Sequence, residues 1–177
     1  DVYMDAVLHP NIYKEEKIFR QEGWHYEMES ADSPITVNGV VYNEMKGAFS
    51  SPESVLDRFT RNVLFPDTTY ANESGGDPAV IPNLTYEQFI EFHRNYYHPA
   101  NSYIYLYGDM DMVQKLTWLD EEYLCRYDRK DCYVDSSIPM QKAFDCPVER
   151  EITYSVTEEE GTADRTYLSV NTVVGTD

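Results

Sequence analysis

The chain has 177 residues, of which 42% are hydrophobic and 14% aromatic. This length allows one domain, or one domain and part of a second, and the composition excludes wholesale disorder and favours sheets backed by helices. The net charge of −18, from 14 basic and 32 acidic side chains, would repel a phosphate backbone and argues against nucleic acid as a partner.

No segment has the features of a membrane span or of a signal peptide, so we expect no membrane partner. The chain begins with Asp1–Leu8, which is typical of the middle of a helix, and ends as abruptly at 173–177. We therefore expect a fragment of a longer protein. Cys125, Cys132 and Cys146 fit no paired CxxC zinc pattern, and an odd number without a signal peptide favours ordinary thiols in a reducing cytosol.

The first half of the chain is predicted to be mainly helical. A helix ends near Leu8, and an amphipathic stretch over 14–20 points Ile18 and Phe19 inward. The alternation of aromatic and polar residues over 24–28 predicts a half-buried strand. Ser51 is a typical N-cap, with proline at the first helical position, for a helix that stops before Pro66.

The second half mixes helices with strands. Thr85 and Gln88 have the spacing of a capping box and predict the start of a helix that ends before Pro99. The remaining expected elements are a strand at 102–107, a helix at 112–124, a linker at 125–147 and strands at 149–156 and 166–174. The last two strands are expected to begin a second domain.

Glu44 is the most informative residue of the chain. It lies in the middle of a predicted helical stripe whose other members are Val37, Val40, Val41, Met45 and Ala48. Burying a carboxylate without a partner costs several kcal/mol. We therefore expect Glu44 to be largely covered by protein. The alternatives are a buried ion pair, a half-exposed edge of the stripe, or a metal ligand whose fellow ligands lie elsewhere.

The motifs that would complete an active site are absent. His9, His25, His93 and His98 form neither HExxH nor HxxEH, and ordinary hydrogen bonding is expected for each ring. Gly75 and Gly76 permit a tight turn, but no GKS/GKT or GxGxxG accompanies them. There is no GxSxG elbow. From its residues alone, the chain lacks a complete catalytic site.

Five segments, in their order and spacing, resemble the presequence-protease branch of the pitrilysin/insulinase (M16) zinc metallopeptidases. These segments are 21–27, 39–47, 74–78, 81–85 and 97–102. The resemblance runs from about residue 1 to residue 111, and a weaker likeness at 164–175 suggests the opening strand of the family's second homologous domain. The implied fold is α+β, with helices on a mainly antiparallel sheet. The implied divisions are part of the zinc-binding domain (1–111), a helix and linker (112–147) and the start of a second domain (148–177).

The resemblance also implies a metal site. In the family an HxxEH helix supplies two zinc-binding histidines and a glutamate that acts as general base, and a later helix supplies the third ligand from an Asn–Glu dipeptide. Glu44 corresponds to that third ligand, and Zn²⁺ would stabilise its ionised form. Asn43 would contact the site or the substrate, or would simply lie on the helix surface. The HxxEH helix is expected upstream of Asp1, so this chain would contain no catalytic residue.

The implied function is that of a fragment of a zinc-dependent endopeptidase that hydrolyses unfolded peptides in an enclosed chamber. Its expected partners are peptide substrates and the remainder of the same polypeptide, and the fragment alone is expected to be inactive and to self-associate. A bacterial-type cytoplasmic location is expected, with an organelle as the other possibility. The alternative function is a non-catalytic homologue that binds or scaffolds peptides.

Overall fold

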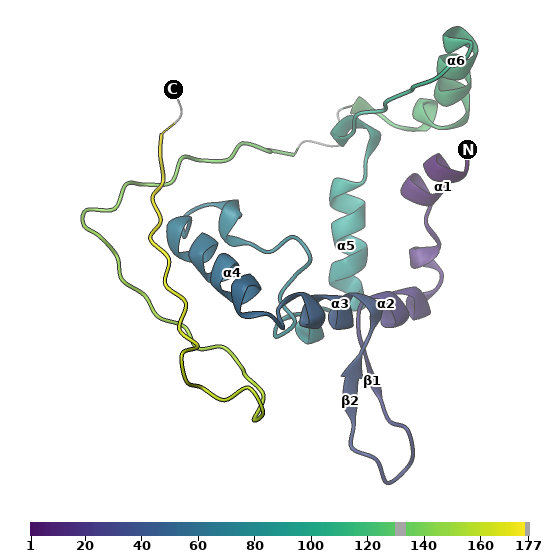
Figure 1. Ribbon diagram of the computed structural model, residues 1–177. Helices are drawn as coiled ribbons and strands as arrows, with labels where there is room; N and C mark the ends of the chain where they lie inside the picture. Colours follow the sequence, from purple (N-terminus) through teal and green to yellow (C-terminus); the bar gives the residue numbers. More distant parts are fainter. Residues whose placement is uncertain (130–133, 176–177) are drawn as a thin grey trace. The chain divides into compact units, whose positions relative to one another are not determined.

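The structure is a computed structural model that describes residues 1–129 and 134–175 (Figure 1). It divides into two compact units, each made of two stretches of the chain. The first unit comprises 1–21 and 84–136, and the second comprises 22–83 and 137–177. The α+β class expected from the sequence is confirmed, and the described residues form one sheet of two antiparallel strands.

The first unit is helical. Its elements are α1 (Val2–Leu8), the 3-10 turn η1 (Asn11–Tyr13), α2 (Glu16–Glu22, which ends at the unit boundary), α5 (Tyr86–Tyr96), η4 (Pro99–Asn101), α6 (Met112–Glu122) and η5 (Leu124–Arg126). Phe19 is buried, as predicted, and its ring centre lies 5.4 Å from that of Phe89 and 6.2 Å from that of Tyr86. Ile90, Leu119 and Tyr123 are the other buried side chains among the described residues of this unit.

The second unit combines a β-hairpin with two helices. Its elements are β1 (His25–Glu27), β2 (Thr36–Asn38), α3 (Val40–Ala48), α4 (Pro52–Leu64), η2 (Thr69–Ala71) and η3 (Ile81–Asn83). Val37 lies on β2 opposite Tyr26. The prediction that Val37 belongs to the helical stripe is therefore wrong, because residues 36–38 pair with β1 before the helix begins. Trp24, Met45 and Ile81 are the buried side chains among its described residues.

The local signals for helix ends are confirmed. The Ser51 hydroxyl accepts a hydrogen bond from the backbone N–H of Ser54, and α4 ends at Leu64, shortly before Pro66. At the start of α5 both bonds of the capping box are present. The N–H of Gln88 donates to the Thr85 hydroxyl, and the N–H of Thr85 donates to the Gln88 side chain. Capping is set by neighbouring residues, so sequence alone predicts it.

The predicted strands at 102–107, 149–156 and 166–174 are not formed. The described residues of these segments are irregular. Within 102–107 the tyrosines are far more exposed than Ile104. Ile104 is itself 43% exposed, so neighbouring elements cover it only in part. A strand needs a neighbour to bind its backbone N–H and C=O groups, and the described residues provide none to these segments.

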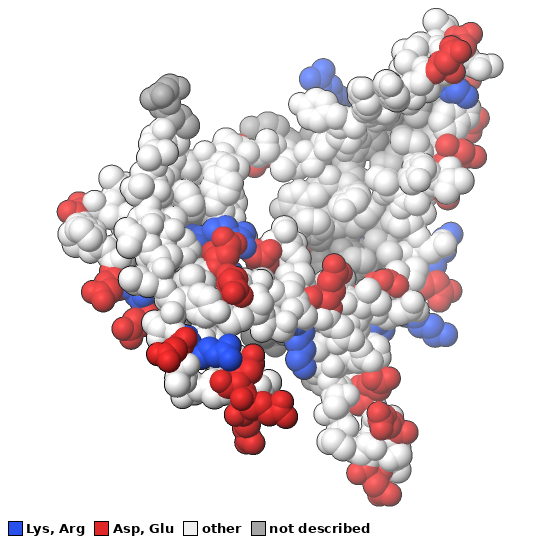
Figure 2. Space-filling model, viewed as in Figure 1, with Lys and Arg blue, Asp and Glu red and all other residues white. Residues whose placement is uncertain are grey.

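Among the charged side chains visible in Figure 2, acidic ones are more prominent than basic ones, and they gather at the tip of the β1–β2 hairpin. Among the described residues, no helix has the length and the apolar character needed to cross a membrane. Cys125 and Cys146 are exposed free thiols, as expected, whereas Cys132 lies outside the described residues.

Candidate functional site

Glu44 lies on α3, as predicted, but its side chain is exposed. Its carboxylate makes no hydrogen bond or ion pair with the part of the chain that the structure describes. The next residue, Met45, is buried. The prediction that protein covers Glu44 is therefore wrong. Successive helix residues point about 100° apart, and only the Met45 side of α3 is packed.

The apolar residues around Glu44 are exposed as well. Val40 is 51% exposed and Val41 is 37% exposed, so the stripe is open along much of its length. An exposed carboxylate carries little desolvation cost, so Glu44 needs no bound cation to offset burial within this chain. The assignment of Glu44 as a metal ligand therefore depends on the Asn43–Glu44 dipeptide and stays a prediction.

Asn43 connects α3 to the hairpin. Its side-chain N–H donates to the Oδ1 of Asn38 (2.5 Å), and the same oxygen accepts the backbone N–H of Gly39 (2.8 Å). The Asn38 amide donates in turn to the Glu27 carboxylate (2.5 Å). Asn43 thus has a structural role within the chain, and any contact it makes with a metal site or substrate stays a prediction.

Gly39 sets the point at which the hairpin turns into α3. Its backbone has φ +152° and ψ 152°, a conformation that L side chains rarely adopt. A Cβ at this position would lie 2.3 Å from the carbonyl oxygen of Gly23 and 2.7 Å from the Cα of Trp24. The N–H of Tyr42 donates to that same carbonyl (3.3 Å). The first turn of α3 therefore lies directly against the backbone that leads into β1.

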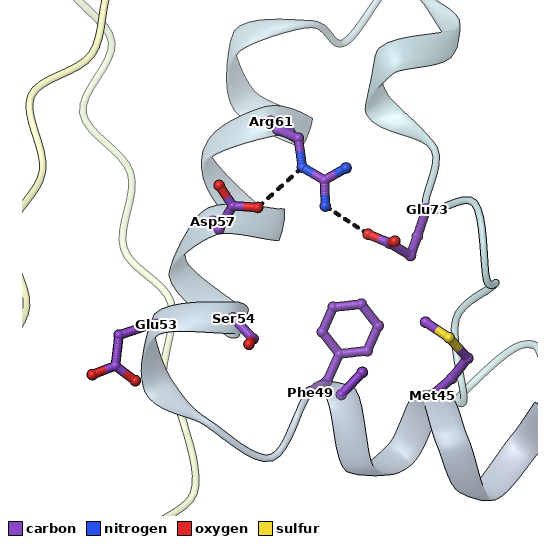
Figure 3. Close-up of a pocket in the computed structure, with 8 residues that line it drawn as sticks. Met45, Phe49, Glu53, Ser54, Asp57, Arg61 and Glu73 are labelled. Carbon is purple, nitrogen blue, oxygen red and sulfur yellow. Dashed lines mark hydrogen bonds and ion pairs between the residues drawn. The ribbon is translucent and has the colours of Figure 1, made fainter.

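A cavity of about 410 Å³ lies between the C-terminal half of α3 and α4 (Figure 3). Its lining residues are Met45, Ala48, Phe49, Glu53, Ser54, Asp57, Arg61 and Glu73. The Arg61 guanidinium is placed between two carboxylates, with its Nη2 2.6 Å from Glu73 and its Nε 3.3 Å from Asp57. Arg61 therefore neutralises part of the acidic lining, and the opposite side of the cavity is apolar.

Glu53 lines this cavity, but its carboxylate is directed away from the other labelled side chains (Figure 3). Its carboxylate raises the pKa of the Tyr167 hydroxyl by unfavourable interaction with the phenolate, and the hydroxyl donates to its Oε1 over 3.4 Å. Tyr167 is in the 166–174 segment. This segment therefore contacts α4 through a side-chain hydrogen bond, and not through backbone pairing with another strand.

The histidine rings have ordinary partners, in agreement with the prediction. The Nε2 of His93 lies 2.8 Å from the carbonyl oxygen of Val7, and its Nδ1 lies 2.7 Å from the Tyr13 hydroxyl. Since a carbonyl can only accept, Nε2 donates and Nδ1 accepts from Tyr13 in the neutral ring. The Nδ1 of His98 accepts the backbone N–H of Ala100 (3.0 Å). These two rings therefore serve local structure.

A metal ion would need ligands beyond those gathered in this chain. Over residues 1–129 and 134–175, no three side chains of His, Cys, Asp or Glu lie close enough together to hold one. A zinc site requires three or four such ligands. Glu44 can supply one carboxylate, so the described residues do not fit a complete zinc site.

The sequence reasoning missed Arg58 and Arg61, which join α4 to the loop that follows it. Arg58 pairs with Asp77, and Arg61 with Glu73. The available signal was their spacing of three residues, which puts both on one helix face, together with an acidic loop close downstream. The spacing alone does not identify the ion-pair partners of the two arginines, because this acidic chain has many other carboxylates that could pair with them.

Similarity to known families decides where this chain belongs. The family described as the Peptidase M16 inactive domain matches residues 83–174, just over half of the chain. The chain belongs to the M16 peptidase family. The expected resemblance to the presequence-protease branch of M16 is thereby confirmed by family and by relatives.

Three relatives show how much of the chain is similar to known proteins. Protein HypA of Clostridium perfringens is 53% identical over 99% of this chain and 18% of its own length. Presequence protease 1, chloroplastic/mitochondrial, of Arabidopsis thaliana is 44% identical over 97% of this chain and 16% of its own length. The mitochondrial presequence protease of Drosophila melanogaster is 48% identical over 70% of this chain and 12% of its own length. The chain thus spans less than a fifth of these M16 relatives.

Proposed function

We propose that this chain is a segment of a zinc-dependent M16 endopeptidase that hydrolyses unfolded peptides inside an enclosed chamber. Membership of a peptidase family supports the peptidase part of this proposal. Relatives named presequence proteases, which match 97% and 70% of the chain at 44% and 48% identity, support the peptide substrate class. The proposed partners are accordingly peptides and the remainder of a longer polypeptide.

Glu44 is the residue of this chain that we propose for the metal site. The observation that carries this step is a carboxylate on α3 that is exposed and has no partner among the described residues, next to Asn43, which is held by Asn38. Such a carboxylate is free to accept a cation without first breaking an ion pair. Bound zinc supplies Lewis-acid chemistry, because it lowers the pKa of a coordinated water to about 7.

The chain alone is proposed to be inactive, since no three-ligand cluster occurs among its described residues and no HxxEH occurs in its sequence. The general base and the other two ligands would come from residues preceding Asp1, in the zinc-binding domain to which we assign 1–111. The matched family, described as an inactive domain, favours a second candidate, a peptide-binding or scaffolding homologue without catalysis. An HxxEH in the preceding residues of the parent gene selects the peptidase.

The bacterial cytoplasm is the proposed location, with an organelle as the alternative. HypA of C. perfringens is 53% identical to this chain, compared with 44% for the chloroplastic/mitochondrial protease of A. thaliana. Fractionation of cells that express the longer protein would test this location.

Glu44→Gln in the longer protein that carries this chain tests the proposed function. The substitution keeps the size of the side chain and removes its charge, so zinc content and cleavage of an internally quenched unstructured peptide should both fall at least ~10-fold. Glu29→Gln is the matched control, because Glu29 is also exposed but lies outside α3. Full zinc occupancy with normal turnover in Glu44→Gln would refute the ligand assignment. Chelator-sensitive cleavage by the 177-residue chain alone would show that the catalytic residues are elsewhere.

A further inference from the structure

The loop at 73–77 packs on the buried side of α3. A Cβ at Gly75 would lie 2.1 Å from the Sδ and 2.8 Å from the Cε of Met45, so glycine allows the loop backbone to approach this side chain closely. Gly76 has φ +90° and faces the buried Ile81. The two glycines therefore do more than permit a surface turn, because they let the loop cover the one packed face of α3.

Three side chains on one face of α4 hold this loop. Arg58, Arg61 and Asn62 are spaced i, i+3 and i+4, which places them together on a helix. Arg58 forms an ion pair with Asp77, Arg61 forms one with Glu73 (2.6 Å), and the Asn62 amide donates to the carbonyl of Ala71. The Glu73 side chain is only 17% exposed, so this pair is shielded from solvent more than a surface ion pair. The loop is thus fixed to α4 at both ends.

Arg58 also contacts the end of α3. Its guanidinium carbon lies 4.7 Å from the centre of the Phe49 ring, and Phe49 caps the C-terminus of α3. A guanidinium can stack on a ring while its N–H groups bind a carboxylate. One side chain therefore connects α4, the loop and the end of α3.

We propose that Arg58 and Arg61 are positioning residues, which act as a brace that fixes the rotation of α3 about its axis. The brace holds the loop in contact with Met45. Glu44 precedes Met45 in the sequence, so its side chain points about 100° away around the helix. Holding Met45 inward therefore holds Glu44 outward, toward the side where its carboxylate is free. The link to zinc depends on the function proposed for Glu44, whereas the brace itself does not.

The test uses Arg58→Ala and Arg61→Glu in the longer protein, with Arg165→Ala as the matched control. Arg165 pairs with Glu160 at 3.9 Å, both side chains are exposed, and neither residue belongs to α3, α4 or the 73–77 loop. Hydrogen exchange of the α3 amides should be ~10-fold faster in both brace variants, and zinc should be lost to a chelator ~10-fold faster, while Arg165→Ala matches the wild type. The charge swap Arg61→Glu/Glu73→Arg should restore both rates when it is made together with Asp57→Asn, which removes the carboxylate that would otherwise repel the new one at position 61.

Each outcome decides one part of the inference. Unchanged α3 exchange in the brace variants, or no restoration by the charge swap, overturns the brace. Faster α3 exchange with unchanged zinc loss, in a protein whose Glu44→Gln variant does lose zinc, overturns the link between the brace and Glu44. Retention of zinc by Glu44→Gln refutes the proposed function alone, and the brace is then judged by α3 exchange. If Arg58→Ala does not fold, Asp77→Asn removes the same ion pair with a smaller change.

Discussion

Replacing Gly39 by alanine should destabilise the second unit by two separable effects. The first is conformational: a non-glycine residue at φ +152° and ψ 152° is in a region that costs about 1–3 kcal/mol. The second is steric: the new Cβ would lie 2.3 Å from the Gly23 oxygen and 2.7 Å from the Trp24 Cα. Overpacking of this kind costs about 1–3 kcal/mol. We expect a total loss of about 2–6 kcal/mol, a large part of a typical domain stability of about 5–15 kcal/mol.

Urea unfolding followed by tryptophan fluorescence measures this loss. The chain has two tryptophans, and a Trp118→Phe background leaves Trp24, which is buried beside Gly39. With a slope of about 2 kcal/mol per molar urea, the midpoint should fall by about 1–3 M with little change in slope.

Two other glycines separate the two effects. Gly161 has φ +65°, and no atom lies within 4 Å of the place that a Cβ would take, so Gly161→Ala should cost only about 1–2 kcal/mol of conformational energy. Gly47 lies in α3 with the same open space, so Gly47→Ala should stabilise the chain by about 0.5–1 kcal/mol. A Gly39→Ala midpoint within about 0.3 M of the parent, roughly the fitting error, would refute the close contact of α3 with the hairpin.

Two further predictions concern the start of α5 and the exposed apolar surface. Thr85→Ala should lower the free energy of unfolding of the first unit by about 0.5–2 kcal/mol, whereas Thr85→Ser should retain the cap. Urea unfolding in a Trp24→Phe background measures both variants. Equal stability of the two would contradict the capping box. The purified 177-residue chain should self-associate and bind the dye ANS, because Val40, Tyr103 and Val41 are among many exposed apolar side chains. A constant monomer mass by light scattering at rising concentration, without ANS fluorescence, would contradict this prediction.

Sequence predicted those parts of the fold that neighbouring residues decide. Ser51, Thr85 and Gln88 cap helices through bonds that span three residues, and the helices begin where these residues indicate. The strands at 149–156 and 166–174 failed for the opposite reason. Their composition is that of strands, but pairing depends on residues distant in sequence, and within the described residues those neighbours are absent.

The helical position of Glu44 was predictable from the sequence, but the environment of its side chain was not. A helical stripe correctly placed Glu44 on a helix, yet the stripe spans more than one packed face, and only the Met45 side meets the 73–77 loop. The spacing of apolar residues shows which side chains of a helix could be buried. Which of them are buried depends on the segment that packs against the helix. The loop in turn is held by Arg58 and Arg61, whose roles depend on a three-dimensional contact that no short motif encodes.

The contact at Gly39 also limits how this part of the chain can evolve. Most steric clashes can be relieved by a second substitution that shortens the opposing side chain. Here the opposing atoms are the Gly23 oxygen and the Trp24 Cα, which every amino acid at positions 23 and 24 retains. No second-site substitution at those positions can therefore make room for a larger residue at 39. A lineage that lost this glycine would have to shift the start of α3 as a whole, and Asn43 and Glu44 would move with it.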